Sequence, residues 1–89
     1  MPKIAIYKYL TFFIVSYDLK ERLHIHITNQ KHYLRTAKIW LDTLEIMEQG
    51  NLSDVEIALA IKLLEKNKEK IVGSIKQFAS GKKIKTIQL

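Results

Sequence analysis

Two histidines placed two residues apart are the side chains in this sequence best suited to chemistry. His24 and His26 lie in the stretch RLHIHITN, residues 22–29. On a strand, side chains two apart project from the same face, with Cα atoms about 6.5–7 Å apart. Two imidazoles so placed can share a metal ion, or flank a phosphate as acid and base, because histidine titrates near neutral pH. The same spacing also arises when histidines occupy the polar face of an ordinary strand.

Both chemical interpretations need further groups beside the histidine pair. A metal ion in a protein is typically held by three or four ligands. The chain has no cysteine, and no spacing fixes the other candidates, which are Asp18, Glu21, His32 and Asp42. We therefore assign no metal ligands and expect no cofactor, and we keep a metal-binding module as one alternative. A small ribonuclease with His24 and His26 as catalytic acid and base is a second alternative.

The residues around the histidines alternate as in a half-buried strand. The apolar Leu23, Ile25 and Ile27 fall on the face opposite to the two histidines. Residues 33–41, YLRTAKIWL, alternate in the same way. Further strands are predicted in the apolar stretches at residues 3–10, 11–17 and 44–48. Because only short turns join these segments, we expect an antiparallel meander of about three to four strands.

Residues 50–57, GNLSDVEI, mark the start of a helix. Ser53 can accept a hydrogen bond from the Glu56 backbone while the Glu56 side chain accepts one from the Ser53 backbone, which is a capping box. Apolar residues then recur at spacings of three, four and seven, so we expect one long amphipathic helix over about residues 53–80. A bend near Asn67 would break it, and the Asn67 side chain is expected to hydrogen-bond a loop backbone.

Packing this helix on the apolar face of the sheet buries both apolar surfaces. We therefore predict an α+β fold in one domain, residues 1–89, made of three parts: a strand-rich segment 1–49, the helix at about 53–80, and a basic tail 81–89 that ends as coil or as a short strand. The free face of the sheet would present His24, His26, Lys38 and Trp40. We predict binding roles for Lys38, Trp40 and the nearby Glu21; a partly covered sheet residue is the alternative for Trp40.

The net charge of +6 comes from the last third of the chain. Residues 1–61 carry seven Lys or Arg and seven Asp or Glu, whereas residues 62–89 carry eight Lys and two Glu. Such asymmetry is typical of a surface for an anionic partner, such as nucleic acid or an acidic protein. A solvated lysine-rich helix is the alternative. The predicted basic binding residues are Lys62, Lys66, Lys70, Lys76, Lys82, Lys83 and Lys85.

An early apolar run lacks the features of a membrane or export segment. The run LTFFIVS, residues 10–16, has seven residues, whereas a membrane span takes about 20. No cleavage site of small residues follows it. Together with the absence of cysteine, this favours a cytoplasmic protein that does not contact a membrane.

Several short stretches occur in an order that resembles a small prokaryotic family. They are MPKI, YKYL, FFIVSY, ERLHIH, AKIWL, GNLSDVEI and KKIKTIQL. The family is known as domain of unknown function 4160, and its members share a Met-Pro-x-Ile start, a His-x-His strand and a C-terminal helix. Arg22 and Thr11 stand where the family often has proline and glycine. The resemblance implies a compact intracellular protein from a small two-gene module, such as a toxin–antitoxin-like pair.

The preferred hypothesis is a non-enzymatic interaction module of the prokaryotic cytoplasm. It would bind a partner protein or a second copy of itself, and nucleic acid through its basic C-terminal third. The family resemblance and the charge asymmetry together support this hypothesis over the two chemical alternatives.

Overall fold

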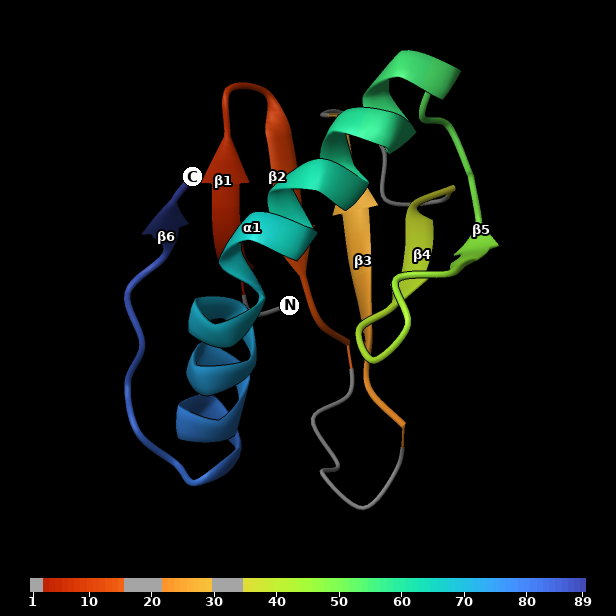
Figure 1. Ribbon diagram of the computed structural model, residues 1–89. Coiled ribbons are helices and arrows are strands. Elements are labelled where there is room, and N and C mark those ends of the chain that lie inside the picture. Colours follow the sequence, from red (N-terminus) through yellow and green to blue (C-terminus); the bar gives the residue numbers. More distant parts are fainter. Residues whose placement is uncertain (1–2, 16–21, 30–34) are drawn as a thin grey trace.

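A six-stranded sheet forms one layer of the protein and a single long helix forms the other (Figure 1). The computed structural model describes residues 3–15, 22–29 and 35–89. The strands are β1 (Lys3–Tyr7), β2 (Leu10–Phe13), β3 (His24–Thr28), β4 (Ala37–Trp40), β5 (Ile46–Glu48) and β6 (Ile87–Gln88). Their order in the sheet is β5-β4-β3-β2-β1-β6. The predicted α+β class is therefore confirmed.

The first five strands form the expected antiparallel meander, and β6 pairs parallel to β1 at the far edge. The sheet has more strands than the three to four predicted. The strand predicted at residues 44–48 is present as the three-residue β5, and the tail forms the two-residue β6. A segment of that length cannot show a period-two pattern, so only its pairing partners make it a strand.

Helix α1 (Asp54–Ala79) begins at the predicted capping box. The Ser53 hydroxyl accepts from the Glu56 backbone N–H at 3.1 Å, and the Glu56 carboxylate accepts from the Ser53 N–H at 2.9 Å. The helix bends at Asn67, where the backbone leaves helical geometry (φ −115°, ψ 17°). The prediction that the Asn67 side chain bonds a loop was wrong. Its amide donates to the Leu63 carbonyl at 2.9 Å, one helical turn back, because the bend frees that carbonyl.

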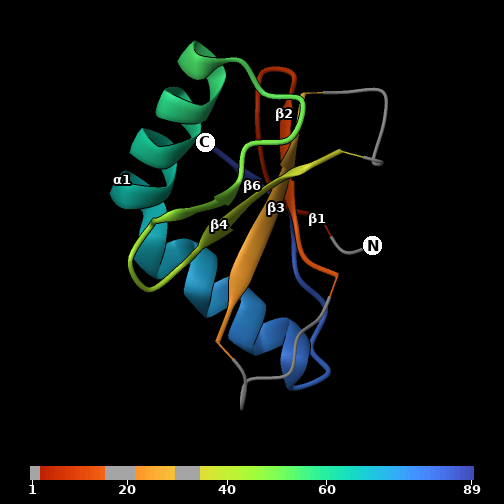
Figure 2. The ribbon, with the colours of Figure 1, turned by 90° about the vertical axis from the view of Figure 1, so that its right-hand side faces the viewer.

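The core lies between α1 and one face of the sheet. Figure 2 shows α1 on one side of the strands. The sheet contributes Ile25, Ile27 and Ile39, which are fully buried, and the helix contributes Leu64 and Ile71 among others. The apolar side chains predicted to face the helix therefore do so. Within the described ranges, no helix is long and apolar enough to cross a membrane.

The turn before α1 holds the start of β4 in place. Gly50 has φ +60°, a conformation that favours glycine. A Cβ at this position would lie 2.5 Å from the Arg35 carbonyl oxygen, which in turn accepts from the Asn51 N–H at 2.9 Å. This close packing of two backbones positions Thr36, the residue that contacts the histidine pair.

Candidate functional site

The face of the sheet opposite to α1 carries both histidines. In the strand register, His24 pairs with Trp40 across to β4, while His26 lies between Phe13 of β2 and Lys38 of β4. Alternation along β3 therefore places the imidazoles together on the side that the helix does not cover. We call this surface the histidine face. It consists of Phe13, Arg22, His24, His26, Lys38 and Trp40.

His26 is buried although it is polar. Its side chain is 7% exposed, and its ring stacks on Phe13 with the centroids 5.4 Å apart. The Nδ1 atom lies 3.0 Å from the Thr36 hydroxyl oxygen, within hydrogen-bond distance. The buried Nε2 atom has no hydrogen-bond partner among the residues that the structure describes. Buried polar atoms are normally paired, so this nitrogen is the most unusual atom of the site.

The surroundings of both histidines favour their neutral forms. Burial lowers the pKa of His26 from 6.5 to about 4, and repulsion by His24 and Lys38 contributes, while Glu48 acts in the opposite direction. Burial, followed by repulsion from Lys38, also lowers the pKa of His24. Both imidazoles are therefore uncharged at neutral pH. They can accept protons or bind a metal, but neither is poised as a general acid at pH 7.

His24 connects the buried histidine to an exposed aromatic stack. Its ring centroid is 4.9 Å from that of His26 and 5.5 Å from that of Trp40, which it meets edge-on. The Arg22 guanidinium lies 4.1 Å from the Trp40 centroid, in a cation–π contact. Arg22 also donates from Nε to Asp42 Oδ2 at 2.8 Å, and this contact lowers the pKa of the Asp42 carboxyl. The order across the surface is thus buried imidazole, half-buried imidazole, indole and exposed guanidinium.

Lys38 and Trp40 lie beside the histidines as the sequence predicted. Lys38 Nζ is also 3.3 Å from Glu48 Oε2, on the neighbouring strand. The predicted Glu21, together with the candidate ligands Asp18 and His32, falls outside the described residues. In residues 3–15, 22–29 and 35–89, no group of three His, Cys, Asp or Glu side chains is placed to hold a metal ion.

Sequence reasoning missed two important members of the histidine face. Arg22 was considered only as a departure from the proline of the family pattern, although its even spacing from His24 and His26 extends the same face. Phe13 and the supporting Thr36 were also missed. Their contacts depend on the register between strands, which alternation within one strand does not reveal.

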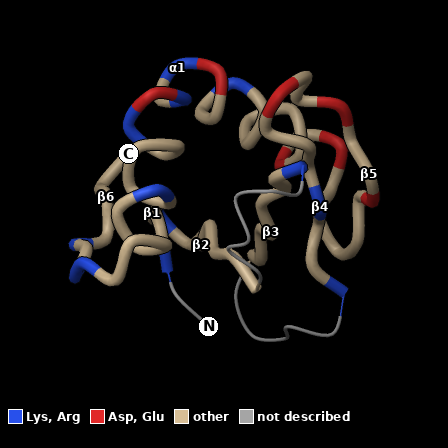
Figure 3. Tube along the Cα trace, turned by 90° about the horizontal axis from the view of Figure 1, so that it is seen from below, with Lys and Arg blue, Asp and Glu red and all other residues tan. Residues whose placement is uncertain are grey.

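The predicted basic residues lie on α1 and on the segment that leads to β6. All seven, Lys62, Lys66, Lys70, Lys76, Lys82, Lys83 and Lys85, are exposed. Figure 3 shows Lys and Asp or Glu alternating along α1. A cleft of about 550 Å³ separates α1 from the C-terminal segment, and its lining includes Lys70, Ser74, Lys83 and Lys85 together with Glu69. Of the seven lysines, Lys70 lines this cleft from α1, and Lys83 and Lys85 line it from the C-terminal segment.

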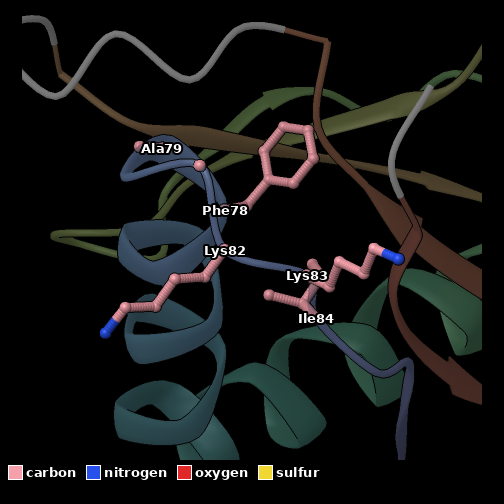
Figure 4. Close-up of a pocket in the computed structure, with 6 residues that line it drawn as sticks. Phe78, Ala79, Lys82, Lys83 and Ile84 are labelled. Atoms are coloured by element: carbon pink, nitrogen blue, oxygen red, sulfur yellow. The ribbon is translucent and has the colours of Figure 1, made fainter.

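A neighbouring hollow of about 640 Å³ lies at the turn after α1. It is lined by Phe78 and Ala79 at the end of α1 and by residues 81–84 of the following turn. In Figure 4 the side chains of Lys82 and Lys83 point in opposite directions. Among the residues that the structure describes, its lining includes no histidine and no carboxylate. The described residues best suited to acid–base or metal chemistry are therefore those of the histidine face.

A comparison with known families gives one match. The model of the family described as a domain of unknown function (DUF4160) matches residues 10–74, which is well over half of the chain. No curated protein and no solved structure gives a significant match. The matched region contains the whole histidine face and most of α1, whereas β1 and the C-terminal segment lie outside it.

Proposed function

We propose that this chain, which belongs to the DUF4160 family, is an interaction module whose histidine face binds a partner protein. The observation that carries the proposal is the stack of Arg22, Trp40 and His24 on a sheet face that α1 leaves free. Tryptophan and arginine are the residues most enriched among the energetic centres of protein interfaces. Here the two are held against each other before any partner arrives, which lowers the entropic cost of binding.

The contacts within the stack support binding more than catalysis. Asp42 fixes the Arg22 guanidinium over the indole, so the cation and the ring present one rigid surface. An acid–base pair would need one protonated imidazole, whereas burial keeps His26 neutral. The ribonuclease alternative therefore has less support from the geometry. It predicts RNA cleavage that falls by about 10²-fold or more in His24→Ala.

The partner that we propose is a protein encoded beside this one, in the cytoplasm of a prokaryote. The family resemblance, with its small two-gene modules of toxin–antitoxin type, supports this choice. A second copy of the chain is the other occupant that the same surface would accept. In either complex, the bound partner covers the stack of Arg22, Trp40 and His24.

Co-purification from the native host with the neighbouring gene product tests the proposal. We expect Trp40→Ala to weaken the complex by at least about 30-fold, the effect of losing an interface residue worth about 2 kcal/mol. Val55→Ala is the matched control, because Val55 is 79% exposed and lies on α1, away from the histidine face. A wild-type protein that elutes alone as a monomer, or equal binding by the two variants, would refute the proposal.

Nucleic acid is a second candidate partner, and the α1 cleft is the observation that favours it. Lys70 on the helix and Lys83 and Lys85 on the C-terminal segment line the same cleft from two sides. Lysines on both sides of a cleft can contact a phosphate backbone, although Glu69 in the same cleft opposes this. The cleft lies in the part of the chain that carries the net positive charge.

Fluorescence anisotropy with a labelled single-stranded RNA at several salt concentrations tests this second function. Replacing Lys83 and Lys85 together by glutamine should reduce the slope of log K against log salt by about 1.4, at about 0.7 for each lost phosphate contact on a single strand. Lys8→Gln, at the exposed turn between β1 and β2, serves as the charge control. Equal slopes in the double variant and the wild type would exclude the cleft as the binding site.

A further inference from the structure

We propose that His24 and His26 form a binding site for one divalent first-row transition ion of the Cu²⁺, Ni²⁺ and Zn²⁺ class, with water completing the coordination. This site would function without the partner protein, so it goes beyond the proposed function. It uses two protein ligands, which agrees with the absence of a three-residue cluster in the described part of the chain.

The first observation is the unpaired nitrogen of His26. The side chain is more than nine-tenths buried, Nδ1 is held by the Thr36 hydroxyl, and Nε2 has no partner among the described residues. When Nδ1 carries the proton and donates it to Thr36, Nε2 presents a bare lone pair. Metal-bound histidines show the same arrangement, with one nitrogen held by an outer partner and the other on the ion.

The second observation is the position of the other imidazole. A metal about 2.1 Å from an imidazole nitrogen lies about 3.2 Å from the ring centre. Two rings bound to one ion at the tetrahedral angle of about 109° then have centres about 5.2 Å apart. The centroids of His24 and His26 are 4.9 Å apart. The separation of the two rings is therefore close to that of two imidazoles on one ion, and the half-exposed His24 provides the entry side.

The charges around the pair determine which ions fit. Lys38 repels a cation here, but its ammonium is 3.3 Å from the Glu48 carboxylate, which offsets part of that charge. Imidazole ligands select transition ions over Mg²⁺ and Ca²⁺, and Cu²⁺ should bind most tightly in this series.

Calorimetric titration of the untagged protein with Zn²⁺ tests the site, and the visible absorption of added Cu²⁺ identifies nitrogen ligands independently. We expect one ion per chain, with binding at least about 10-fold weaker in His24→Ala. Thr36→Val should weaken binding by about 10–100-fold, because it removes the outer partner of His26. Lys38→Gln should tighten binding, since it removes the nearest repelling charge.

The control variant is Glu65→Gln, which removes an exposed carboxylate of α1, on the other side of the sheet from the histidines, and should bind like the wild type. No Zn²⁺ or Cu²⁺ binding by the wild type would overturn the proposal, as would unchanged binding in both His24→Ala and Thr36→Val or a large loss in Glu65→Gln. These variants do not require the buried His26 to be replaced, so the result does not depend on whether His26→Ala folds. Partner binding measured in a chelator separates this site from the proposed function, which predicts binding without any metal.

Discussion

The buried His26 should make the protein sensitive to mild acid. Its pKa is 6.5 in an ordinary environment and about 4 in the fold. Between these two values the unfolded chain binds a proton that the folded protein does not, so the free energy of unfolding falls as the pH falls. The full difference of about 2.5 pKa units corresponds to about 3.4 kcal/mol, which is reached only below pH 4.

The loss at pH 5 is the most useful quantity to measure. Relative to pH 7, linkage gives a decrease of about 1.8 kcal/mol from His26. Because pH 5 lies above the pKa of the folded state, this loss depends almost entirely on the ordinary pKa of 6.5. A domain of this size has a total stability of about 5–10 kcal/mol, so the decrease is readily measured.

Urea unfolding followed by the fluorescence of Trp40, at pH 7 and at pH 5, measures the effect. The comparison is with His26→Gln, whose amide can still bond Thr36 but does not titrate. His24, whose pKa is also lowered, is present in both proteins and contributes to both losses. We expect the wild type to lose about 1.8 kcal/mol more than the variant. Equal losses in the two proteins, or titration of His26 near 6.5 by NMR, would refute the reasoning.

Three further substitutions test how the fold supports the site, with the urea midpoint at pH 7 as the measurement. Ser53→Ala should lower stability by about 1 kcal/mol, since it removes the hydroxyl that accepts from Glu56; an unchanged midpoint would show that the cap contributes nothing. Gly50→Ala should cost about 1–3 kcal/mol, because its Cβ would meet backbone atoms at a positive φ; a neutral result would contradict the turn geometry. Gly73→Ala should instead raise stability by about 0.5–1 kcal/mol, since a Cβ at this helical position meets nothing within 4 Å; a lower stability would show that another group contacts this surface.

The sequence predicts which side chains of β3 face the helix, because its apolar and polar residues alternate. A shift of the strand by one residue would place every side chain on the wrong face. Ile25 and Ile27 are fully buried against α1, and a slip would expose both while burying the histidines in the core. The start of α1 was equally predictable, since a capping box involves residues only three apart. Signals of this kind are local, so they can be read from one segment of the chain.

The difference between the two histidines could not be predicted in the same way. Both histidines are flanked by apolar residues in the sequence, yet His26 is almost fully buried while His24 is half-buried. The burial of His26 depends on Phe13 and Thr36, which come from β2 and from the start of β4. Their positions follow from the strand register, and a single sequence carries little information about register.

The pairing of β6 with β1 could not be predicted from the sequence for a similar reason. Ile87 and Gln88 pair parallel to Ala5 and Ile6, across nearly the whole length of the chain. A two-residue strand has no period of its own, and the tail was equally compatible with coil. The chain can form this pairing because the segment after α1 is long enough to return along the edge of the sheet (Figure 1).

The two proposals concern one surface, so they place a condition on each other. His24 contacts His26 on one side and Trp40 on the other, and it would be a metal ligand as well as a support for the interface. An ion that rotates His24 must change the packing under Trp40, and it would then change partner affinity by some factor. Linkage requires the partner to change the affinity for the ion by the same factor. Measuring Zn²⁺ affinity with and without the bound partner, and partner affinity with and without Zn²⁺, should therefore give equal ratios. Ratios of one in both measurements would mean that the ion and the partner do not meet at His24, because coupling through this residue must change both affinities.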